Sequence, residues 1–266
     1  MRARARRGLS SLGTKYLMAL TGLALIGFVL VHMAGNLLIF AGRGALNSYA
    51  HHLEELGILL WIARIVLLAI FVLHISLGIR LWIQNREARP NRYYCERALT
   101  ASWASRHMML TGLVILAFVV YHLMHFTFGI IDPANSKRTL SPVPLGEESK
   151  KFPIYGTSPR TTSLTEDPNK KIYSGPLVPD LESNVVASFR QRIYGVPWIA
   201  VSYIIAQLIL GLHLWHGGSS WLQSLGLNRR RPGWLVNLIG PILALIVVVG
   251  NCSIPVAICW LRYIPS

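Results

Sequence analysis

Five apolar stretches, each of about 20 residues or more, constrain the fold of this chain more than any other feature. They lie at about 17–41, 57–83, 107–129, 196–222 and 234–261. A helix of about 20 apolar residues crosses the ~30 Å hydrocarbon core of a bilayer. Charged residues make up 14% of the 266 residues, against about 25% in a soluble domain. The sequence therefore predicts an all-α integral membrane protein with five transmembrane helices.

The charge pattern predicts the orientation of these helices. The net charge of +15 suggests a nucleic-acid partner at first sight, but membrane proteins concentrate Lys and Arg in cytoplasmic loops. The basic segment 1–16, the loop after the second helix and the Arg229–Arg231 cluster are rich in arginine, whereas the first loop is not. The amino terminus is therefore expected in the cytoplasm and the carboxy terminus outside, with membrane lipid rather than nucleic acid as the surrounding partner.

The chain divides into four parts by composition. Residues 1–16 form the cytoplasmic basic segment, 17–129 the first three helices, 130–195 a long extracytoplasmic loop and 196–261 the last two helices. The end of the long loop, 184–194, has apolar residues at helical spacing, which suggests a short helix on the membrane surface. The three cysteines form no CxxCH motif, which excludes covalent c-type haem.

Two motifs occur twice and indicate a duplicated two-helix unit. MALTGL at 18–23 returns as MMLTGL at 108–113, and in each case a histidine, His32 or His122, follows the threonine by eleven residues. The second motif comprises a histidine followed by glycine, tryptophan and glutamine at fixed spacing. Its members are His74, Gly78, Trp82 and Gln84 in one copy and His213, Gly217, Trp221 and Gln223 in the other.

Membrane depth decides which histidines face each other. At 1.5 Å per residue, His32 lies ~22 Å from the inner edge of the membrane, and His122 lies at a similar depth. His74 and His213, on helices that run inward, both lie ~6–8 Å from the inner edge of a ~30 Å core. We therefore expect an outer pair of His32 with His122 and an inner pair of His74 with His213.

Two facing imidazoles across a helix bundle are what a six-coordinate haem iron needs. A single intramembrane histidine has a simpler explanation, a hydrogen bond across the bundle, but two depth-matched pairs favour two haems. Gly78 and Gly217 lie one turn after His74 and His213, where a flat macrocycle needs room. Close packing of two helices explains the same glycines.

Other histidine assignments remain open. His125 and His216 each follow a pair member by three residues and share its helix face, so they form a rival ligand set. In our preferred assignment they contact the haems or their propionates. Zinc needs three or four ligands at one depth, often with Cys or a carboxylate, and no acidic residue lies in any predicted span.

The sequence resembles the five-helix dihaem cytochrome b family that anchors succinate:quinone oxidoreductases and quinol:fumarate reductases in the membrane. The resemblance covers nearly the whole chain except 130–182. It is carried by the segments 11–15, 21–22, 32–36, 42–44, 47–49, 121–123, 212–217 and 223–226 together with Ser220. One position departs from some fumarate reductases, which have Glu two residues before the fourth haem ligand where this chain has Gly211.

The resemblance implies two b haems, both bound by histidine, and a place in a respiratory chain of a bacterial cytoplasmic membrane. Separate flavoprotein and iron–sulfur subunits would dock on the cytoplasmic face. Electrons from succinate would pass through the inner and outer haems to a quinone, and the dihaem type implies menaquinone. No succinate site is expected on this chain.

The quinone site is only weakly marked. Glu54 and Glu55, beside two histidines near the outer edge, are candidates for exchanging quinone protons, although a solvated loop explains them as well. Ser11, Lys15 and Trp221 mark a second candidate site at the inner edge.

Other functions stay open at this point. A dihaem cytochrome b of formate dehydrogenase, hydrogenase or nitrate reductase also has paired histidines. A transporter or channel that relays protons through histidine is a second alternative. An intramembrane protease is disfavoured because the chain has no GxSxG motif and no paired Asp in a predicted span.

Overall fold

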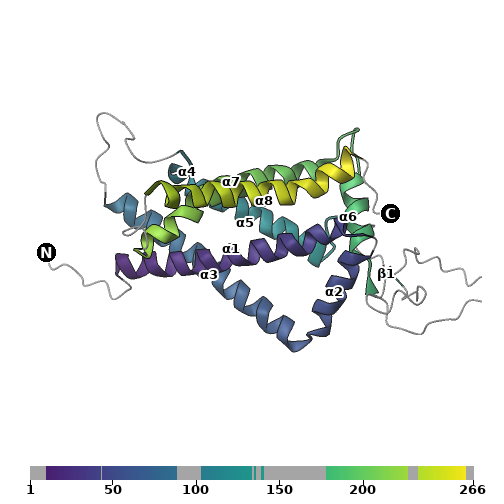
Figure 1. Cartoon of the computed structure of the whole chain (residues 1–266), viewed down its shortest axis with the longest axis horizontal. Helices are drawn as coiled ribbons and strands as arrows, with labels where there is room; N and C mark the ends of the chain where they lie inside the picture. The colour runs from purple at the N-terminus through teal and green to yellow at the C-terminus, as the bar shows by residue number, and fades with distance from the viewer. Residues whose placement is uncertain are drawn as a thin grey trace, which may run out of the picture. The chain divides into compact units, whose positions relative to one another are not determined.

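The computed structural model describes residues 10–42, 44–88, 103–133, 135, 139–140, 178–226 and 233–261 (Figure 1). The elements in chain order are α1 Ser11–Leu37, η1 Leu38–Phe40, α2 Ala45–Glu55, α3 Ile58–Glu87, α4 Trp103–Arg106, α5 Met108–His122, η2 Leu123–Thr127, β1 Thr139–Leu140, β2 Val178–Pro179, α6 Leu181–Arg190, α7 Trp198–Ser224 and α8 Gly233–Cys259. The strands β1 and β2 pair antiparallel. Several sequence predictions lie outside the described residues, namely those on the basic residues 1–9, the arginines of 89–102, Arg229–Arg231 and most of the 130–195 loop.

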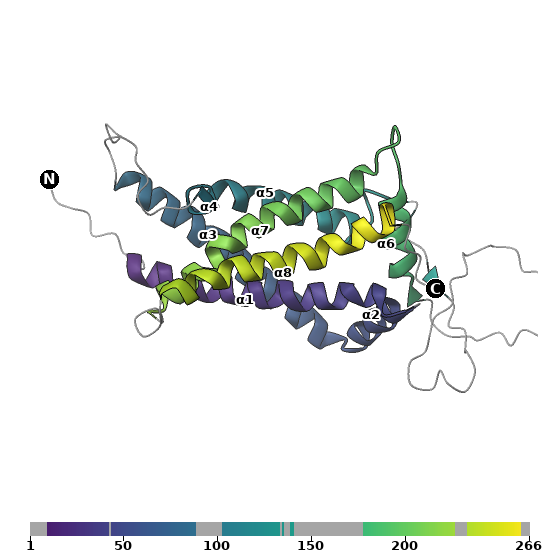
Figure 2. The same cartoon turned by 45° about the horizontal axis from the view of Figure 1, so that its top comes forward.

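Among the described residues, five helices are long and apolar enough to cross a membrane: α1 with η1, α3, α5 with η2, α7 and α8. Each coincides with one of the five apolar stretches, so the prediction of an all-α integral membrane protein is confirmed. The helices α7 and α8 run beside each other in both views (Figures 1 and 2), and Leu214 of α7 packs with Ala244 and Val247 of α8.

The chain forms two compact units, and both contain parts of all five long helices. Unit 1 comprises Met1–Leu30, Ala63–Ile115 and Leu208–Val248, and unit 2 comprises Val31–Ile62, Leu116–Gln207 and Val249–Ser266. His74 and His213 belong to unit 1, whereas His32 and His122 belong to unit 2. The two predicted histidine pairs therefore fall in separate units.

The first helix begins six residues before its predicted start at 17. The Ser10 side chain accepts a hydrogen bond from Gly13 N at 3.1 Å, as an N-cap serine does. The Thr14 hydroxyl donates to Ser10 O at 3.0 Å. The prediction placed the start at the beginning of the apolar run, but the polar residues before that run already form the first turns.

The segment between the first two apolar stretches, which we expected to be a loop, contains the helix α2. Gly44 before the helix has φ +80° and Gly57 after it has φ +52°, a conformation that glycine adopts at little cost. The buried residues of α2 are Leu46, Asn47 and Ser48. The helix was missed because the segment is short and mostly polar, without a continuous apolar run.

The polar face of α2 binds α6 through a buried network. Asn47 Nδ2 donates to Asp180 Oδ1 at 3.0 Å, and Asn47 Oδ1 accepts from Glu182 N at 3.0 Å. Glu182 Oε2 accepts from Gly44 N at 2.8 Å. Asp180 also caps α6 by accepting from Ser183 N at 3.0 Å. These hydrogen bonds join α2 to α6, two segments that lie far apart in sequence.

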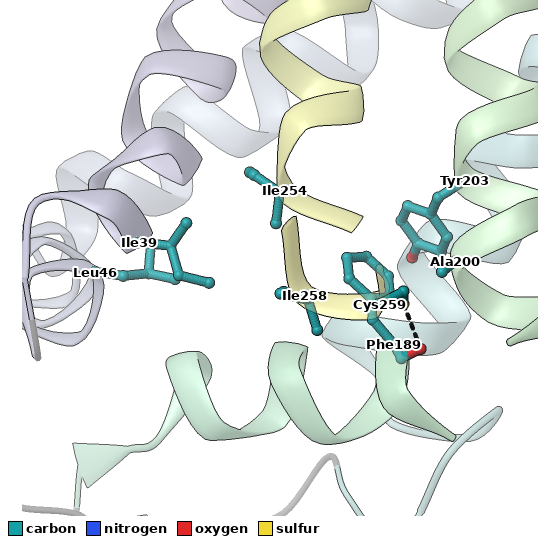
Figure 3. Packing of buried hydrophobic residues seen from close by; sticks show 8 residues of the cluster. All are labelled: Ile39, Leu46, Phe189, Ala200, Tyr203, Ile254, Ile258 and Cys259. Atoms are coloured by element: carbon teal, nitrogen blue, oxygen red, sulfur yellow. Dashed lines mark hydrogen bonds between the residues drawn. The ribbon is translucent and has the colours of Figure 1, made fainter. Parts of the chain in front are cut away.

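The short helix predicted at 184–194 is present as α6, which begins at Leu181 and ends at Arg190. Its Phe189 packs in a buried cluster with Tyr203 of α7 and Ile258 of α8 (Figure 3). The Cys259 thiol donates to Phe189 O at 3.0 Å. Phe189 therefore contacts the long helices, and the position of α6 at a membrane surface stays a prediction.

We predict that Asn47→Ala lowers the free energy of unfolding by about 1–3 kcal/mol, the usual cost of leaving a buried polar group without its partner. Asn47 is 1% exposed and bonds both Asp180 and Glu182. The measurement is thermal unfolding of the purified protein in detergent. Asn237→Ala, at an exposed position of α8, is the control and should change stability by less than about 0.5 kcal/mol. Equal melting temperatures for the two variants would contradict the prediction.

Candidate functional site

The inner histidine pair is held by two threonines at equivalent positions of the repeat. His74 of α3 forms a hydrogen bond through Nδ1 with the Thr21 hydroxyl of α1 at 3.0 Å. His213 of α7 forms the same bond through Nδ1 with the Thr111 hydroxyl of α5 at 3.0 Å. The two imidazoles lie close enough for an electrostatic interaction. The structure thus brings together the two histidines that the depth argument paired.

Each threonine hydroxyl has one proton, which it donates to a backbone carbonyl of its own helix. Thr21 Oγ1 donates to Leu17 O at 2.8 Å and Thr111 Oγ1 to His107 O at 3.1 Å. The threonine oxygens therefore accept from the histidines, so Nδ1 of each ring carries the proton. A neutral imidazole has one proton, which leaves Nε2 of both His74 and His213 as a bare lone pair. A metal ligand needs this arrangement.

Two glycines let the histidine rings lie against the neighbouring helices. A Cβ atom on Gly22 would lie 3.3 Å from Cε1 of His74, and one on Gly112 would lie 3.5 Å from Cε1 of His213. Both glycines directly follow the threonines that bind the histidines. The contact at Gly22 is tight enough that a Cβ atom would shift the His74 ring by a few tenths of an ångström, whereas the contact at Gly112 is an ordinary van der Waals distance.

Gly78 and Gly217, which we expected to leave room for a macrocycle, lie beside methionines of the repeat. A Cβ atom on Gly78 would lie 3.6 Å from Cε of Met18, and one on Gly217 would lie 4.0 Å from Cε of Met108. Both are ordinary contact distances. The contact is repeated in the two copies, and the role of these glycines toward a macrocycle stays a prediction.

The two histidines of the outer pair also lie close together, within unit 2. The ring centres of His32 on α1 and His122 on α5 lie 5.8 Å apart, with the ring planes at 90°. Two imidazoles bound to one metal ion from opposite sides at about 2 Å each have ring centres roughly 6 Å apart. The separation fits a pair of axial ligands on one iron.

The outer pair has a different hydrogen-bond partner from the inner pair. His122 Nδ1 lies 3.2 Å from the hydroxyl of Tyr203 on α7, and His125 Nδ1 lies 2.9 Å from the same oxygen. His125 is 0% exposed and stacks on Phe126 with ring centres 4.0 Å apart. The Tyr203 hydroxyl therefore lies within hydrogen-bond distance of both His122 and His125.

The donor set favours iron in a macrocycle over zinc. Within the described ranges, no group of three or more His, Cys, Asp or Glu side chains gathers around one point. A structural zinc ion takes four protein ligands and a catalytic one takes three, whereas a haem iron takes two axial ligands from the protein. Two separate pairs of imidazoles match the second requirement.

The candidate quinone residues fall into two groups. At the end of α2, Glu55 Oε1 lies 3.4 Å from His51 Nε2 and Glu55 Oε2 lies 3.2 Å from His52 Nδ1. Glu54 is exposed beside them. The structure therefore assembles an acid–base cluster around Glu55 in particular.

The inner-edge candidates are less organised. Ser11 and Lys15 are exposed in the first turns of α1. In the part of the chain that the structure describes, the indole Nε1 of Trp221 is buried without a hydrogen-bond partner, and no hydrogen bond joins it to Ser11 or Lys15. His216, on α7, lies within electrostatic reach of His213. A polar ligand would satisfy the Trp221 N–H.

Three functional residues had no assigned role in the sequence analysis: Thr21, Thr111 and Tyr203. A signal existed for the threonines, because they occupy identical positions in the two copies of the repeat. Tyr203 lies 81 residues from His122, outside any repeated motif.

The arrangement as a whole offers two separate pairs of imidazoles on the long apolar helices, in which His74, His122 and His213 are partly buried and His32 is exposed. At the inner pair, both rings are held through Nδ1 by a neighbouring helix, so that Nε2 is available to an iron. No protein-family description, curated protein or solved structure matches this chain.

Proposed function

We propose that the chain is the membrane-anchor cytochrome b of a succinate:quinone oxidoreductase. The observation that carries the proposal is the inner pair, in which Thr21 and Thr111 hold Nδ1 of His74 and His213 at 3.0 Å. Such bonds to the second ring nitrogen are usual for metal-bound histidine and raise its basicity. The motifs shared with the dihaem anchor family support the same assignment.

Each haem would be held by one histidine pair. His74 and His213 would bind the inner haem, and His32 and His122 the outer one. Bound there, the two b haems would supply one-electron transfer across the membrane. The protein itself orients the imidazoles and keeps Nε2 free of a proton. In a bilayer, its apolar helices would limit the access of water to both sites.

The proposed partners follow from orientation. With the amino terminus in the cytoplasm of a bacterium, the inner pair lies near the face where an iron–sulfur subunit, itself bound to a flavoprotein, would dock. Basic side chains at this face, such as Arg80, Arg86 and Arg106, suit an acidic protein surface or anionic lipid. The electron acceptor would be a quinone, and menaquinone fits the dihaem type.

We expect two low-spin b haems per copy of this chain in the purified complex, because two imidazole pairs are present. His74→Ala or His213→Ala should remove one haem, and His32→Ala or His122→Ala should remove the other. His125→Ala and His216→Ala should retain both. A pyridine haemochrome assay measures the ratio, and a native ratio of one or zero would refute the pairing.

The orientation is tested with topology reporters. Because the positive-inside rule places the arginine-rich short loops in the cytoplasm, a reporter fused after Ser266 should read as outside. A reporter inserted within 85–100 should read as cytoplasmic. The reverse pattern would put the docking face on the wrong side of the membrane.

We expect Glu55→Gln to slow succinate-dependent quinone reduction in sealed vesicles about tenfold or more, because a positioned acid–base group contributes about 10²–10⁴-fold. Glu55 contacts both His51 and His52, so Glu54→Gln should have a smaller effect. Glu87→Gln, at the opposite end of α3, is the charge-matched control. Full activity in Glu55→Gln, with equal rates with and without an uncoupler, would instead favour a quinone site near Ser11, Lys15 and Trp221.

A further inference from the structure

Tyr203 connects the outer ligand His122 to a second, deeply buried histidine. Its hydroxyl oxygen lies 3.2 Å from His122 Nδ1 and 2.9 Å from His125 Nδ1. Tyr203 is 8% exposed and its ring packs against Phe118, Phe126 and Phe189. The phenol is therefore held in place by aromatic contacts between the two imidazoles.

A phenol has one proton and can donate it to only one of the two imidazoles, so the two hydrogen bonds run in one direction along the three side chains whenever a histidine accepts that proton. In one direction, His122 Nδ1–H donates to Tyr203 and Tyr203 donates to His125 Nδ1. In the other, His125 donates to Tyr203 and Tyr203 donates to His122 Nδ1. The second direction places the proton of His122 on Nε2, where a metal ligand needs a lone pair.

We propose that Tyr203 is a positioning residue for the outer haem ligand and that His125 sets the direction of its proton. This inference rests on the proposed function. With Nδ1 of His125 accepting the phenol proton, the Tyr203 oxygen accepts from His122 Nδ1–H and leaves Nε2 of His122 free. Hydrogen bonds in such a chain strengthen one another.

When Tyr203 donates its proton to His125, His125 acts as a hydrogen-bond acceptor and not as an iron ligand. Its proton then lies on Nε2, which is buried without a hydrogen-bond partner among the described residues. His125 lies in the π-helix η2, where the Phe128 N–H donates to Leu123 O at 2.9 Å. Short π-helical turns are frequent at functional sites. The π-helical turn η2 follows His122 directly and places His125 against Tyr203.

The two pairs therefore differ in the group that holds Nδ1. Thr21 and Thr111 give their protons to their own backbones, so the inner histidines have a fixed acceptor. Tyr203 gives its proton to another side chain, so the acceptor strength at His122 depends on His125. Replacing Tyr203 or His125 should therefore change the reduction potential of the outer haem and leave that of the inner haem unchanged.

The experiment measures the reduction potential of each haem in the intact complex, with His74→Ala used to identify the outer haem. Tyr203→Phe should retain both haems and shift the outer potential to a more positive value, because His122 loses its acceptor and becomes a weaker donor to iron. Tyr121→Phe removes a hydroxyl from the same aromatic cluster, with ring centres 5.8 Å from Tyr203, and should leave both potentials unchanged.

Variants of His125 test the direction of the proton. His125→Leu, which has no acceptor, should shift the outer potential in the same direction but by less than Tyr203→Phe. His125→Gln, whose amide oxygen accepts the phenol proton, should restore the native value. Nitrogen-15 spectra of the complex with both haems in the diamagnetic, low-spin ferrous state should show the His125 proton on Nε2.

The possible failures are distinguishable. Absence of haem from the native complex would refute the proposed function together with the inference. Two haems, with an outer potential that is unchanged in Tyr203→Phe, would refute the inference alone. A proton on Nδ1 of His125 would also refute it, as would equal shifts in Tyr203→Phe and Tyr121→Phe.

Discussion

The cost of burying an imidazole in a membrane governs the arrangement of this protein. A neutral imidazole has one donor nitrogen and one acceptor nitrogen, and leaving either without a partner in hydrocarbon costs ~2–7 kcal/mol. At His74 and His213 the donor is satisfied by a threonine on the neighbouring helix. The acceptor nitrogen then remains for a group that the chain itself does not supply, and an iron that needs two axial ligands suits it.

The duplicated helix pair explains why this solution occurs twice in unit 1. In each copy one helix contributes a threonine followed by a glycine, and the next contributes the histidine that lies against both. At Gly22 and Gly112 the histidine rings lie 3.3 and 3.5 Å from the position that a Cβ atom would take, so both rings pack closely against the neighbouring helix. The outer pair departs from this symmetry, because a tyrosine with a transferable proton replaces the threonines. The two pairs would therefore hold chemically different sites within similar helices.

Sequence reasoning predicted the five membrane helices well, because length and apolar content determine them almost without context. It expected the histidine pairs from helix rise and direction alone, and the structure places each pair within one unit, while their depth in a membrane stays a prediction. It missed α2, which is short and mostly polar and packs on α6 through the hydrogen bonds of Asn47 as well as through Leu46. It also placed the start of α1 too late, at the beginning of the apolar run instead of at the Ser10 cap.

The sequence by itself determined the membrane-spanning class, the repeat and the four histidines at two depths. Only the tertiary structure decided what holds each histidine. The bonds of Thr111 with His213 and of Tyr203 with His122 join residues 102 and 81 positions apart. No local pattern encodes such a bond, because it depends on how helices rotate and pack against one another.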